Sequence, residues 1–458
     1  MSYSSTTHSV AKELMQDPRL ANAKHMILET IKEHRKKITS VKPSQDNLKA
    51  SYHETLKAFE TYRGIPLIYP YLGTGIGNGP LVELEDGSVK YDMISGIGTH
   101  FSHSHPKLIA ASLDAAIENT VMQGNLQQNR DSFELSKALV EASGLNHCIL
   151  TTSGAMANEN GLKLCFAKKA PATRILTFEG TFMGRTTTLA QITDKPHFRQ
   201  GLPLNFSVDY LPFYNPKDPE GSRERACQAL KTYLKRYPKA HAACCFELIQ
   251  GESGYYPGSQ TFFVFLMKIL KKAGIPIFID EVQTFGRTDH LFAFQHFNLS
   301  EYPDIVTIGK LSQTCATLYR TAFKPPRGLI SQTFTASSSA IRCAKVIIEE
   351  LITSDYLGKN GKNMQLRNRF VSHLERLSKI HPDKIKGPFG YGLMISFIPY
   401  EGTEEQAMDF AKNLFEKGVI CFVAGKDPTR IRFHLPTAEM TLKDIDQVVA
   451  IIEQVIET

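Results

Sequence analysis

The sequence of 458 residues contains no long apolar run. No stretch approaches the roughly 18 consecutive apolar residues that a membrane-spanning helix needs. The N-terminal stretch MSYSSTTHSVAKELMQD is polar throughout and lacks the basic start, apolar run and cleavage site of a secretory signal. The apolar fraction of 42% and the charged fraction of 22% are typical of a globular chain. We therefore expect a cytoplasmic protein that does not bind a membrane.

The sequence also lacks paired cysteine motifs and basic stripes interspersed with aromatic residues. None of the eight cysteines forms a C-x-x-C pair, and most lie in apolar surroundings such as HAACCFELI (241–249), which indicates reduced, packed thiols. The formal net charge of +7 is spread out, with a short cluster at HRKK (34–37), so the surface attracts small anions and does not call for nucleic acid. We expect no disulfide framework, no metal site and no nucleic-acid partner.

The N-terminal segment, residues 1–75, is predicted to be helical. Apolar residues between Leu48 and Phe59 recur at helical spacing, Ser44 is a candidate N-cap, and Gly64 can end the helix. No internal repeat and no low-complexity tract interrupts the chain. Because its apolar residues recur at helical spacing, the N-terminal segment is expected to pack against the rest of the protein, and the sequence leaves its role open.

The next part of the chain, residues 76–335, is predicted to be a large α/β domain. Two short strand-like runs flank the turn Asp86–Gly87. Longer apolar runs then alternate with helical stretches: CILTT (148–152), RILTF (174–178), HAACCFELI (241–249), PIFID (276–280) and DIVTI (304–308). Continuous apolar runs without in-out alternation indicate strands buried on both faces. The repeated strand-helix order indicates a mainly parallel sheet covered by helices.

Residues 336–458 are predicted to form a smaller α+β domain. The expected helices are 338–353, 362–380, 404–417 and 441–456, and the expected strands are GLMISFIP (392–399) and VICFVA (419–424).

Charged residues close two of the buried runs in the large domain. Asp280 ends PIFID, and a carboxylate in that place costs several kcal/mol unless it is paired. Lys310 comes just after DIVTI, where burial lowers the pKa of a lysine so that its amine can attack a carbonyl. The 30 residues from Asp280 to Lys310 allow one helix and one returning strand. Both side chains can therefore lie at the carboxyl edge of neighbouring strands, where ligands bind.

Two further stretches follow predicted strands and remain ambiguous when taken alone. Ser153, Gly154 and Ala155 open a predicted helix, whose N-terminal N–H groups bind phosphate well, although Ser153 can equally be an ordinary N-cap. Phe182 and Arg185 share a loop that could stack a planar ligand and hold a carboxylate. A packed phenylalanine and a solvated arginine are the alternative.

Pyridoxal 5'-phosphate satisfies these features together. Lys310 takes the aldehyde as a Schiff base, Asp280 pairs with the ring nitrogen, the helix start at Ser153 takes the phosphate, and Phe182 stacks on the ring. By keeping the ring nitrogen protonated, Asp280 lets the ring stabilise a substrate carbanion. The large domain is therefore predicted to bind this cofactor.

The sequence also resembles the class III pyridoxal-phosphate-dependent aminotransferases of fold type I, over about residues 75–456. The resemblance rests on seven ordered motifs: SHSHP (102–106), SGAMANE (153–159), MGRT (183–186), ELIQGE (247–252), DEVQTFGRT (280–288), PDIVTIGK (303–310) and RFHLP (432–436).

The resemblance implies roles for the cofactor residues. Lys310 and Asp280 keep the roles given above, and Lys310 also transfers the proton. Gln283 contacts the ring oxygen, and Gly154 and Ala155 bind the phosphate through backbone groups. Thr333 matches a residue that reaches the phosphate of the neighbouring subunit, which implies a homodimer with shared active sites.

It also implies a substrate class. Arg185 and Arg432 match arginines that hold the distal and α-carboxylates of glutamate or 2-oxoglutarate. Glu252 matches a carboxylate that pairs with Arg432 when an ω-amine is bound instead. We expect an ω-aminotransferase that moves an amino group from an ω-amino acid or diamine-type donor, such as N-acetylornithine, ornithine, 4-aminobutyrate or lysine, to 2-oxoglutarate, giving glutamate.

Other readings stay open at this point. The chain could be an aminomutase or a decarboxylating aminotransferase on the same fold, or a catalytically weak relative kept as a scaffold. Three positions depart from the family pattern: Met156 replaces an acidic residue, Met183 a histidine or aromatic residue, and Leu248 a proline. These departures leave the amino donor undetermined.

Overall fold

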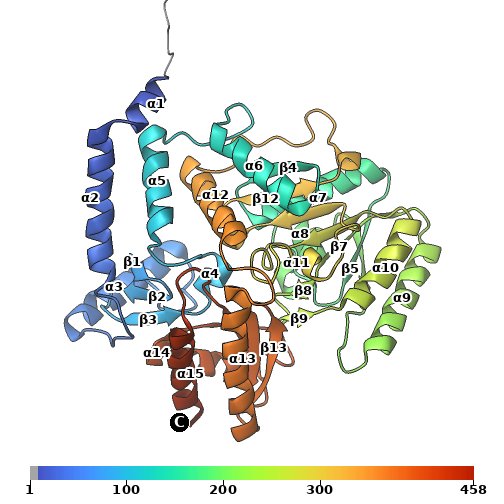
Figure 1. Cartoon of the computed structure of the whole chain (residues 1–458). Helices are drawn as coiled ribbons and strands as arrows, with labels where there is room; N and C mark the ends of the chain where they lie inside the picture. The colour runs from blue at the N-terminus through green and yellow to red at the C-terminus, as the bar shows by residue number, and fades with distance from the viewer. Residues whose placement is uncertain (1–8, 458) are drawn as a thin grey trace, which may run out of the picture.

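The computed structural model describes residues 9–457 and contains a large seven-stranded sheet (Figure 1). Its order is β4-β12-β11-β10-β7-β5-β6, and only β12 runs antiparallel to its neighbours. The strands are β4 (His147–Thr151), β5 (Arg174–Phe178), β6 (Ser207–Leu211), β7 (His241–Glu247), β10 (Ile277–Asp280), β11 (Ile305–Ile308) and β12 (Cys315–Tyr319). The predicted mainly parallel α/β sheet is confirmed, whereas β6 and β12 were not predicted.

Helices cover both faces of this sheet, which explains the unbroken apolar runs. One face packs on α7 (Gly154–Lys169) and α8 (Leu189–Ile192). The other packs on α6 (Arg130–Ser143), α9 (Pro219–Arg236), α10 (Gln260–Lys272) and α12 (Ser338–Thr353). Adjacent residues of β7 belong to different cores, because Cys244 faces the second group of helices and Cys245 faces the first. All eight cysteines are free, as the sequence predicts.

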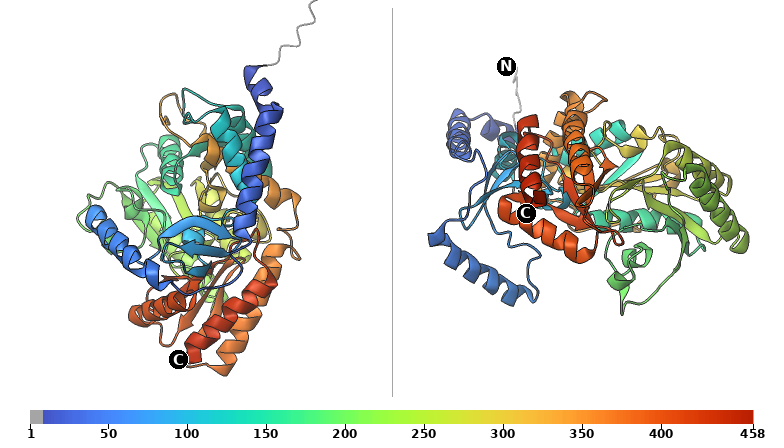
Figure 2. Two further views of the ribbon diagram at one scale, coloured as in Figure 1. Left: turned by 90° about the vertical axis from the view of Figure 1, so that its left-hand side faces the viewer. Right: turned by 90° about the horizontal axis from the view of Figure 1, so that it is seen from below.

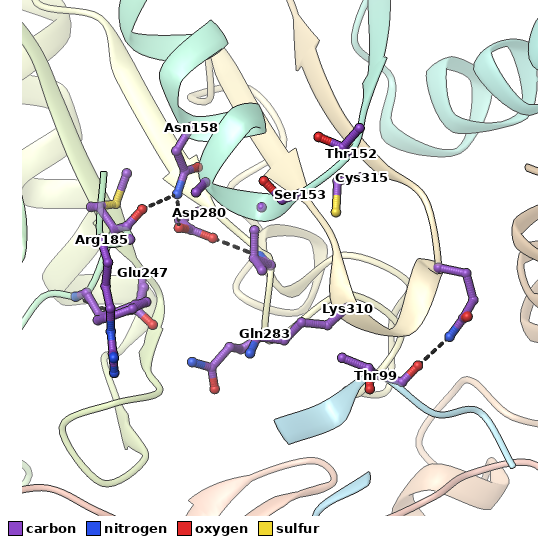
Figure 3. A pocket seen from close by; sticks show the side chains of 17 residues that line it. Thr99, Thr152, Ser153, Asn158, Arg185, Glu247, Asp280, Gln283, Lys310 and Cys315 are labelled. Atoms are coloured by element: carbon purple, nitrogen blue, oxygen red, sulfur yellow. Dashed lines mark hydrogen bonds between the residues drawn. The ribbon is translucent and has the colours of Figure 1, made fainter. Parts of the chain in front are cut away.

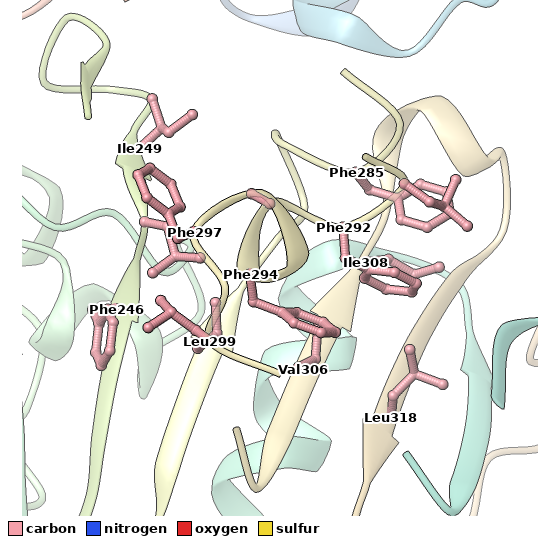
Figure 4. Close-up of a cluster of buried hydrophobic side chains, with 14 of the residues drawn as sticks. Phe246, Ile249, Phe285, Phe292, Phe294, Phe297, Leu299, Val306, Ile308 and Leu318 are labelled. Atoms are coloured by element: carbon pink, nitrogen blue, oxygen red, sulfur yellow. The ribbon is translucent and has the colours of Figure 1, made fainter. Parts of the chain in front are cut away.

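The segment between β10 and β11 forms an aromatic core beside the sheet (Figure 4). Phe292, Phe294 and Phe297 surround the short helix α11 (Ala293–His296) and are buried. Glu281 is also buried, and its carboxylate accepts hydrogen bonds from the backbone N–H groups of Ala293 and Phe294 at 2.6 and 2.8 Å. Successive strand residues point to opposite sides. The Glu281 side chain thus holds α11, and the side chain of its neighbour Asp280 points away from α11, to the opposite side of the chain.

Two four-stranded sheets and three long helices lie beside the large sheet. One sheet is β1 (Gly73–Asn78), β2 (Leu81–Leu84), β3 (Val89–Asp92) and β15 (Val419–Ile420); the other is β13 (Ile385–Tyr391), β14 (Met394–Pro399), β17 (Arg430–His434) and β16 (Phe422–Ala424). The helices are α13 (Lys362–Ile380), α14 (Glu404–Lys417) and α15 (Leu442–Glu457). The predicted helix bounds match those of α12, α13 and α14, and α15 lies one residue later than predicted. Strands β13 and β17 were not predicted.

The first sheet joins distant parts of the chain. Strand β15 pairs with β3 in parallel, so residues 81–94 share one hydrophobic core with α13, α14 and α15. The turn at Asp86–Gly87 links β2 to β3, as predicted, and Gly87 has a φ of 76°. The domain boundaries predicted after residues 75 and 335 stay predictions.

Three helices, α1 (Val10–Met15), α2 (Pro18–Arg35) and α3 (Asp46–Arg63), precede these sheets. The first eight residues of the predicted helical segment lie outside the described range. Ser44 is the wrong N-cap, because α3 begins after Gln45, whose side chain makes no capping hydrogen bond. Gly64 ends α3 in the left-handed conformation, as predicted.

The N-terminal helices differ in how they attach to the rest of the chain. Helix α2 lies along α5 (Pro106–Glu118), where Lys24 pairs with Asp114 at 2.6 Å. Helix α3 lies at the edge of the molecule (Figure 2). Among residues 9–457 no helix is both long and apolar enough to cross a membrane. The predicted cytoplasmic location stays a prediction.

Candidate active site

The carboxyl ends of β7, β10 and β11 meet at one edge of the large sheet. Asp280 lies opposite Glu247 on one side and opposite Thr307 on the other, and Lys310 follows β11 two residues later. Asp280 and Lys310 therefore come from neighbouring strands, as predicted. A cavity of about 460 Å³ opens at this edge (Figure 3). It is lined by Thr99, Thr152, Ser153, Gly154, Ala155, Asn158, Phe182, Met183, Gly184, Arg185, Glu247, Asp280, Val282, Gln283, Lys310, Gln313 and Cys315.

Asp280 is a buried carboxylate with two hydrogen-bond donors from the protein. Its Oδ1 accepts from the Val282 N–H at 2.8 Å, and its Oδ2 accepts from Asn158 Nδ2 at 2.7 Å (Figure 3). Burial raises the pKa of Asp280 to about 6, against the opposing effect of these two hydrogen bonds and of the Lys310 charge. At neutral pH the carboxylate is thus ionised and can pair with a further cationic group.

Glu247 is a second buried carboxylate beside Asp280. It accepts hydrogen bonds from the backbone N–H groups of Gly251 at 3.0 Å and Phe182 at 2.9 Å. Burial, together with the charge of Asp280, raises the pKa of Glu247 to about 8. Glu247 therefore fixes the loop that carries Phe182, and the protonated form of Glu247 limits charge repulsion at this edge.

Lys310 has a strained backbone and a buried amine. Its φ is 55°, a left-handed conformation that non-glycine residues rarely adopt. Its Nζ donates a hydrogen bond to the carbonyl oxygen of Ile97 at 3.1 Å. Burial lowers the pKa of Lys310 to about 8. The amine can therefore exchange a proton near neutral pH.

Ile97 belongs to a left-handed turn, α4 (Ser95–Gly98), which lies over Lys310. Ile97 has φ 64° and ψ 49°, an unfavourable conformation for a β-branched residue. Arg287 donates a hydrogen bond to the Gly98 carbonyl, and a Cβ at Gly98 would lie 2.8 Å from Nη2 of Arg287. The loop that follows Asp280 thus holds this turn in place.

The start of α7 lies at the cavity, where the sequence predicts an anion site. Ser153 caps the helix through its Oγ, which accepts from the Met156 N–H at 3.2 Å, so the ordinary capping role holds as well. The N–H groups of Gly154 and Ala155 lie in the first turn, where no helical acceptor exists for them. A Cβ at Gly154 would lie 2.8 Å from Val282. Glycine thus allows the helix start to approach the loop after Asp280.

The predicted aromatic and arginine pair lies at the wall of the cavity. Phe182 and Arg185 both line it, and Arg185 is exposed. The guanidinium carbon of Arg185 lies 4.1 Å from the ring centroid of Phe198, a cation–π contact that orients the side chain. Among residues 9–457, no ion pair involves Arg185. Its charge is thus available to an anionic ligand.

Glu252 and Arg432 form a bidentate ion pair next to this cavity. The two hydrogen bonds measure 2.8 and 3.2 Å, and Arg432 is fully buried. Burial alone would raise the pKa of Glu252, but the Arg432 guanidinium lowers it to about 2. Gln283 connects the pair to the cavity, because its Nε2 donates to Glu252 Oε1 at 3.3 Å. Neither Glu252 nor Arg432 lines the cavity itself.

Thr333 lies apart from the cavity of its own chain. It is exposed, and its segment runs beside residues 123–125, where the Asn125 N–H donates to the Gln332 carbonyl. Its chain neighbour Phe334 is exposed as well, and so is Leu126, which follows the paired residues 123–125. Thr333 thus does not line the cavity of its own chain.

Three residues of this region were not predicted. Asn158 Nδ2 also donates to the Met183 carbonyl at 2.8 Å, and Asn158 Oδ1 accepts from the Thr307 hydroxyl at 2.6 Å. Asn158 lies in the motif SGAMANE and Thr307 in PDIVTIGK. The four-residue spacing from Gly154 to Asn158 is about one helical turn, which places both on one side of α7, and this was the signal in the sequence that could have indicated Asn158. Lys195 donates to the Glu252 carbonyl at 3.2 Å, and burial lowers its pKa. It belongs to no motif.

The residues at this edge fit pyridoxal 5'-phosphate. An ionised carboxylate, a lysine amine and a helix N-terminus face one cavity, which has the size of a cofactor site. Gln283 Oε1 is buried and has no hydrogen-bond partner among the described residues, so it can accept a hydrogen bond from a ligand hydroxyl.

Comparison with known proteins gives a consistent result. The family model described as aminotransferase class-III matches residues 74–456. The acetylornithine aminotransferase of Methanocaldococcus jannaschii is 30% identical over 436 residues, covering 90% of this chain and 98% of that protein. The acetylornithine aminotransferase of Archaeoglobus fulgidus is 29% identical over 385 residues, covering 82% and 93%. The crystal structure of a Bacillus anthracis aminotransferase has a TM-score of 0.80 at 18% identity, covering 89% of this chain and 99% of that one. The structural match shows the fold alone.

Proposed function

Because the chain belongs to the class III aminotransferase family, whose members depend on pyridoxal 5'-phosphate, we propose that it is an ω-aminotransferase. It moves an amino group from an ω-amino acid or diamine-type donor to 2-oxoglutarate, giving glutamate. The observation that carries the proposal is the Glu252–Arg432 pair, which lies next to a cavity that Arg185 lines. The similarity to two acetylornithine aminotransferases supports a donor of this kind.

The proposed cofactor residues are those at the strand ends and the start of α7. Lys310 holds the cofactor covalently through Nζ, Asp280 pairs with its ring nitrogen, and Gln283 Oε1 accepts from its ring hydroxyl. Ser153, Gly154 and Ala155 bind the phosphate, and Phe182 covers the ring. When bound, pyridoxal 5'-phosphate supplies an electron sink for the carbanion formed at the substrate carbon.

Lys310 is also the proposed acid and base. Its Nζ has a pKa lowered to about 8 by burial, so it can take a proton from the substrate carbon and return it near neutral pH. The contact from Nζ to the Ile97 carbonyl orients the amine. The buried surroundings exclude water from the reacting proton.

The proposed substrate residues serve two substrates in turn. A donor that presents an ω-amine leaves Glu252 paired with Arg432, so that no unpaired cation remains in the buried site. Glutamate or 2-oxoglutarate brings an α-carboxylate that replaces Glu252 on Arg432. The second carboxylate of these substrates reaches Arg185, which is free of carboxylate partners in the described part of the chain.

The homodimer is part of the proposal. Exposed Phe334 adjoins Thr333, and exposed Leu126 follows Asn125, which pairs with Gln332; exposed apolar side chains of this kind suit a contact between two copies. A second copy would then bring Thr333 to the phosphate of its partner.

The test is an assay of the purified protein reconstituted with pyridoxal 5'-phosphate. N-acetylornithine, ornithine, 4-aminobutyrate and lysine are offered as donors with 2-oxoglutarate as acceptor, and glutamate is measured. Glutamate formation with at least one of them supports the proposal. A donor that is isomerised or decarboxylated without glutamate formation would favour an aminomutase or a decarboxylating enzyme. In a parallel assay with pyruvate as acceptor, transfer of the amino group to pyruvate but not to 2-oxoglutarate would remove the proposed acceptor.

A further inference from the structure

A second group of potential ligands lies at the far end of the loop that carries Asp280 and Gln283. Asp289, His290 and His296 each offer one ligand atom, and these atoms all lie within 4.8 Å of one another. Asp289 Oδ1 is 2.7 Å from Nδ1 of His296 and 3.2 Å from Nδ1 of His290. We propose that these three residues form a binding site for a divalent transition metal of the Zn²⁺ type.

The donor set suits such an ion. Two imidazoles and one carboxylate are common ligands of Zn²⁺, which binds them at about 2.0 to 2.2 Å and leaves a fourth position for water. Around such an ion the ligand atoms lie about 3.3 to 3.6 Å from one another, so the Asp289 and His296 atoms, 2.7 Å apart, separate slightly when the ion binds. The His290 side chain is 48% exposed, whereas the Asp289 side chain is 7% exposed. An ion thus has a path from solvent and a ligand that is already desolvated.

His296 and Asp289 are each held by contacts with the surrounding fold. His296 stacks on the ring of Tyr391, with the ring centroids 4.2 Å apart. Its helix, α11, is anchored by the buried rings of Phe292, Phe294 and Phe297 (Figure 4). The Asp289 carbonyl accepts from the Gly358 N–H at 2.7 Å. A site with fixed ligands loses little conformational freedom when the ion binds.

The place of Asp289, His290 and His296 in the fold indicates a structural role for the ion. The adjoining residues of the loop are already tied to the C-terminal part, because Asn363 Nδ2 donates to the Thr288 carbonyl at 2.9 Å and the Leu393 N–H donates to the Arg287 carbonyl at 2.9 Å. Arg287 in turn holds the turn over Lys310 through the Gly98 carbonyl. A bound ion would tie Asp289 and His290 to His296 of α11 and so brace this loop, which also contacts α13 and the hairpin β13–β14.

An Asp–His hydrogen bond without any ion is the competing explanation of the same distances, and direct titration separates the two. The cofactor-loaded enzyme is freed of metal by a chelator and titrated with Zn²⁺ in a calorimeter. We expect one equivalent to bind, and the melting temperature to rise with added Zn²⁺ because the ion binds only the folded chain.

Substitutions of the proposed ligands test where the ion binds. His290→Ala, at the most exposed ligand, and Asp289→Asn should each weaken Zn²⁺ binding at least tenfold and abolish the rise in melting temperature. His25→Ala, an exposed histidine on α2, is the matched control and should leave both unchanged. Co²⁺ provides a second readout, since its visible absorption changes with imidazole coordination and should differ between the wild type and His290→Ala. No stoichiometric binding in the wild type, or equal binding in all variants, would overturn the proposal.

Discussion

Asn158 donates a hydrogen bond from Nδ2 to Oδ2 of Asp280 at 2.7 Å. The same amide is fixed by the Thr307 hydroxyl and the Met183 carbonyl, so it has no other orientation available. A hydrogen bond to the ionised carboxylate favours that form and opposes the effect of burial. Asn158 therefore helps to keep Asp280 charged at neutral pH.

Replacing Asn158 should move the pH dependence of cofactor binding. The pKa of Asp280 is raised to about 6, so the carboxylate is ionised above that pH and is lost as a partner for the ring nitrogen as the pH falls through it. Without the hydrogen bond the pKa rises further. We expect the affinity for pyridoxal 5'-phosphate to fall at a higher pH in Asn158→Ala than in the wild type.

Equilibrium titration with the cofactor over a pH series measures this shift. The titrating groups of the cofactor are common to both proteins, so the difference between the two profiles reports on Asp280. Thr307→Val is the control, because it loosens Asn158 but keeps its bond to Asp280, and it should give a smaller shift. Superimposable profiles for Asn158→Ala and the wild type would show that Asn158 does not tune Asp280.

Removing the amine of Lys310 should abolish transamination. Lys310→Ala lacks both the group that holds the cofactor and the base, and loss of a positioned base alone costs about 10² to 10⁴ in rate. The variant should fold, because only a side chain at a ligand site is truncated. Steady-state turnover and circular dichroism measure the two effects. Turnover near the wild-type value would mean that Lys310 has been assigned the wrong role.

Each active site should need Thr333 from a second chain. Thr333→Ala should bind the cofactor more weakly, and a mixed dimer with Lys310→Ala should recover one site of wild-type affinity. That site combines Lys310 of one chain with Thr333 of the other. Cofactor titration of refolded mixtures, together with sedimentation, tests this. An active monomer, or no recovery in the mixture, contradicts shared sites.

Removing Glu252 should make the protein depend on a carboxylate ligand. Glu252→Ala leaves Arg432 fully buried without its partner, which costs about 3 to 5 kcal/mol of the free energy of unfolding. The α-carboxylate of 2-oxoglutarate can replace Glu252, so this acid should raise the melting temperature of the variant more than that of the wild type. An equal rise in both would mean that the acid does not reach Arg432.

Strand-end residues could be predicted from the sequence because burial and charge conflict there. Asp280 and Lys310 each stand at the end of a continuous apolar run, where a buried charge needs a partner that a ligand can supply. The sheet was predictable because both faces of β7 and β10 are buried, so that each strand is a continuous apolar run. The wrong N-cap at Ser44 shows the opposite case, because capping depends on a local geometry that several polar residues satisfy equally well.

Other parts of the site depend on contacts that the sequence does not carry. Asn158 becomes important only because α7 crosses β10 and β11, and Lys195 only because its loop returns to Glu252. The left-handed turn at Ile97 runs against the preference of a β-branched residue, so no local rule predicts it. The group at Asp289 forms through packing on Tyr391, a residue of β13, which was not predicted.

The use of 2-oxoglutarate is tested most directly at Arg185. The measurement is the single-turnover rate of each half-reaction in the wild type and in Arg185→Ala, with Arg185→Lys as a control that keeps the charge but loses the bidentate geometry. Losing a charge-assisted contact to the distal carboxylate should cost about 2 to 5 kcal/mol in the half-reaction of glutamate or 2-oxoglutarate. The half-reaction of an ω-amine donor without that carboxylate should change far less. Equal losses with both kinds of substrate would contradict the account.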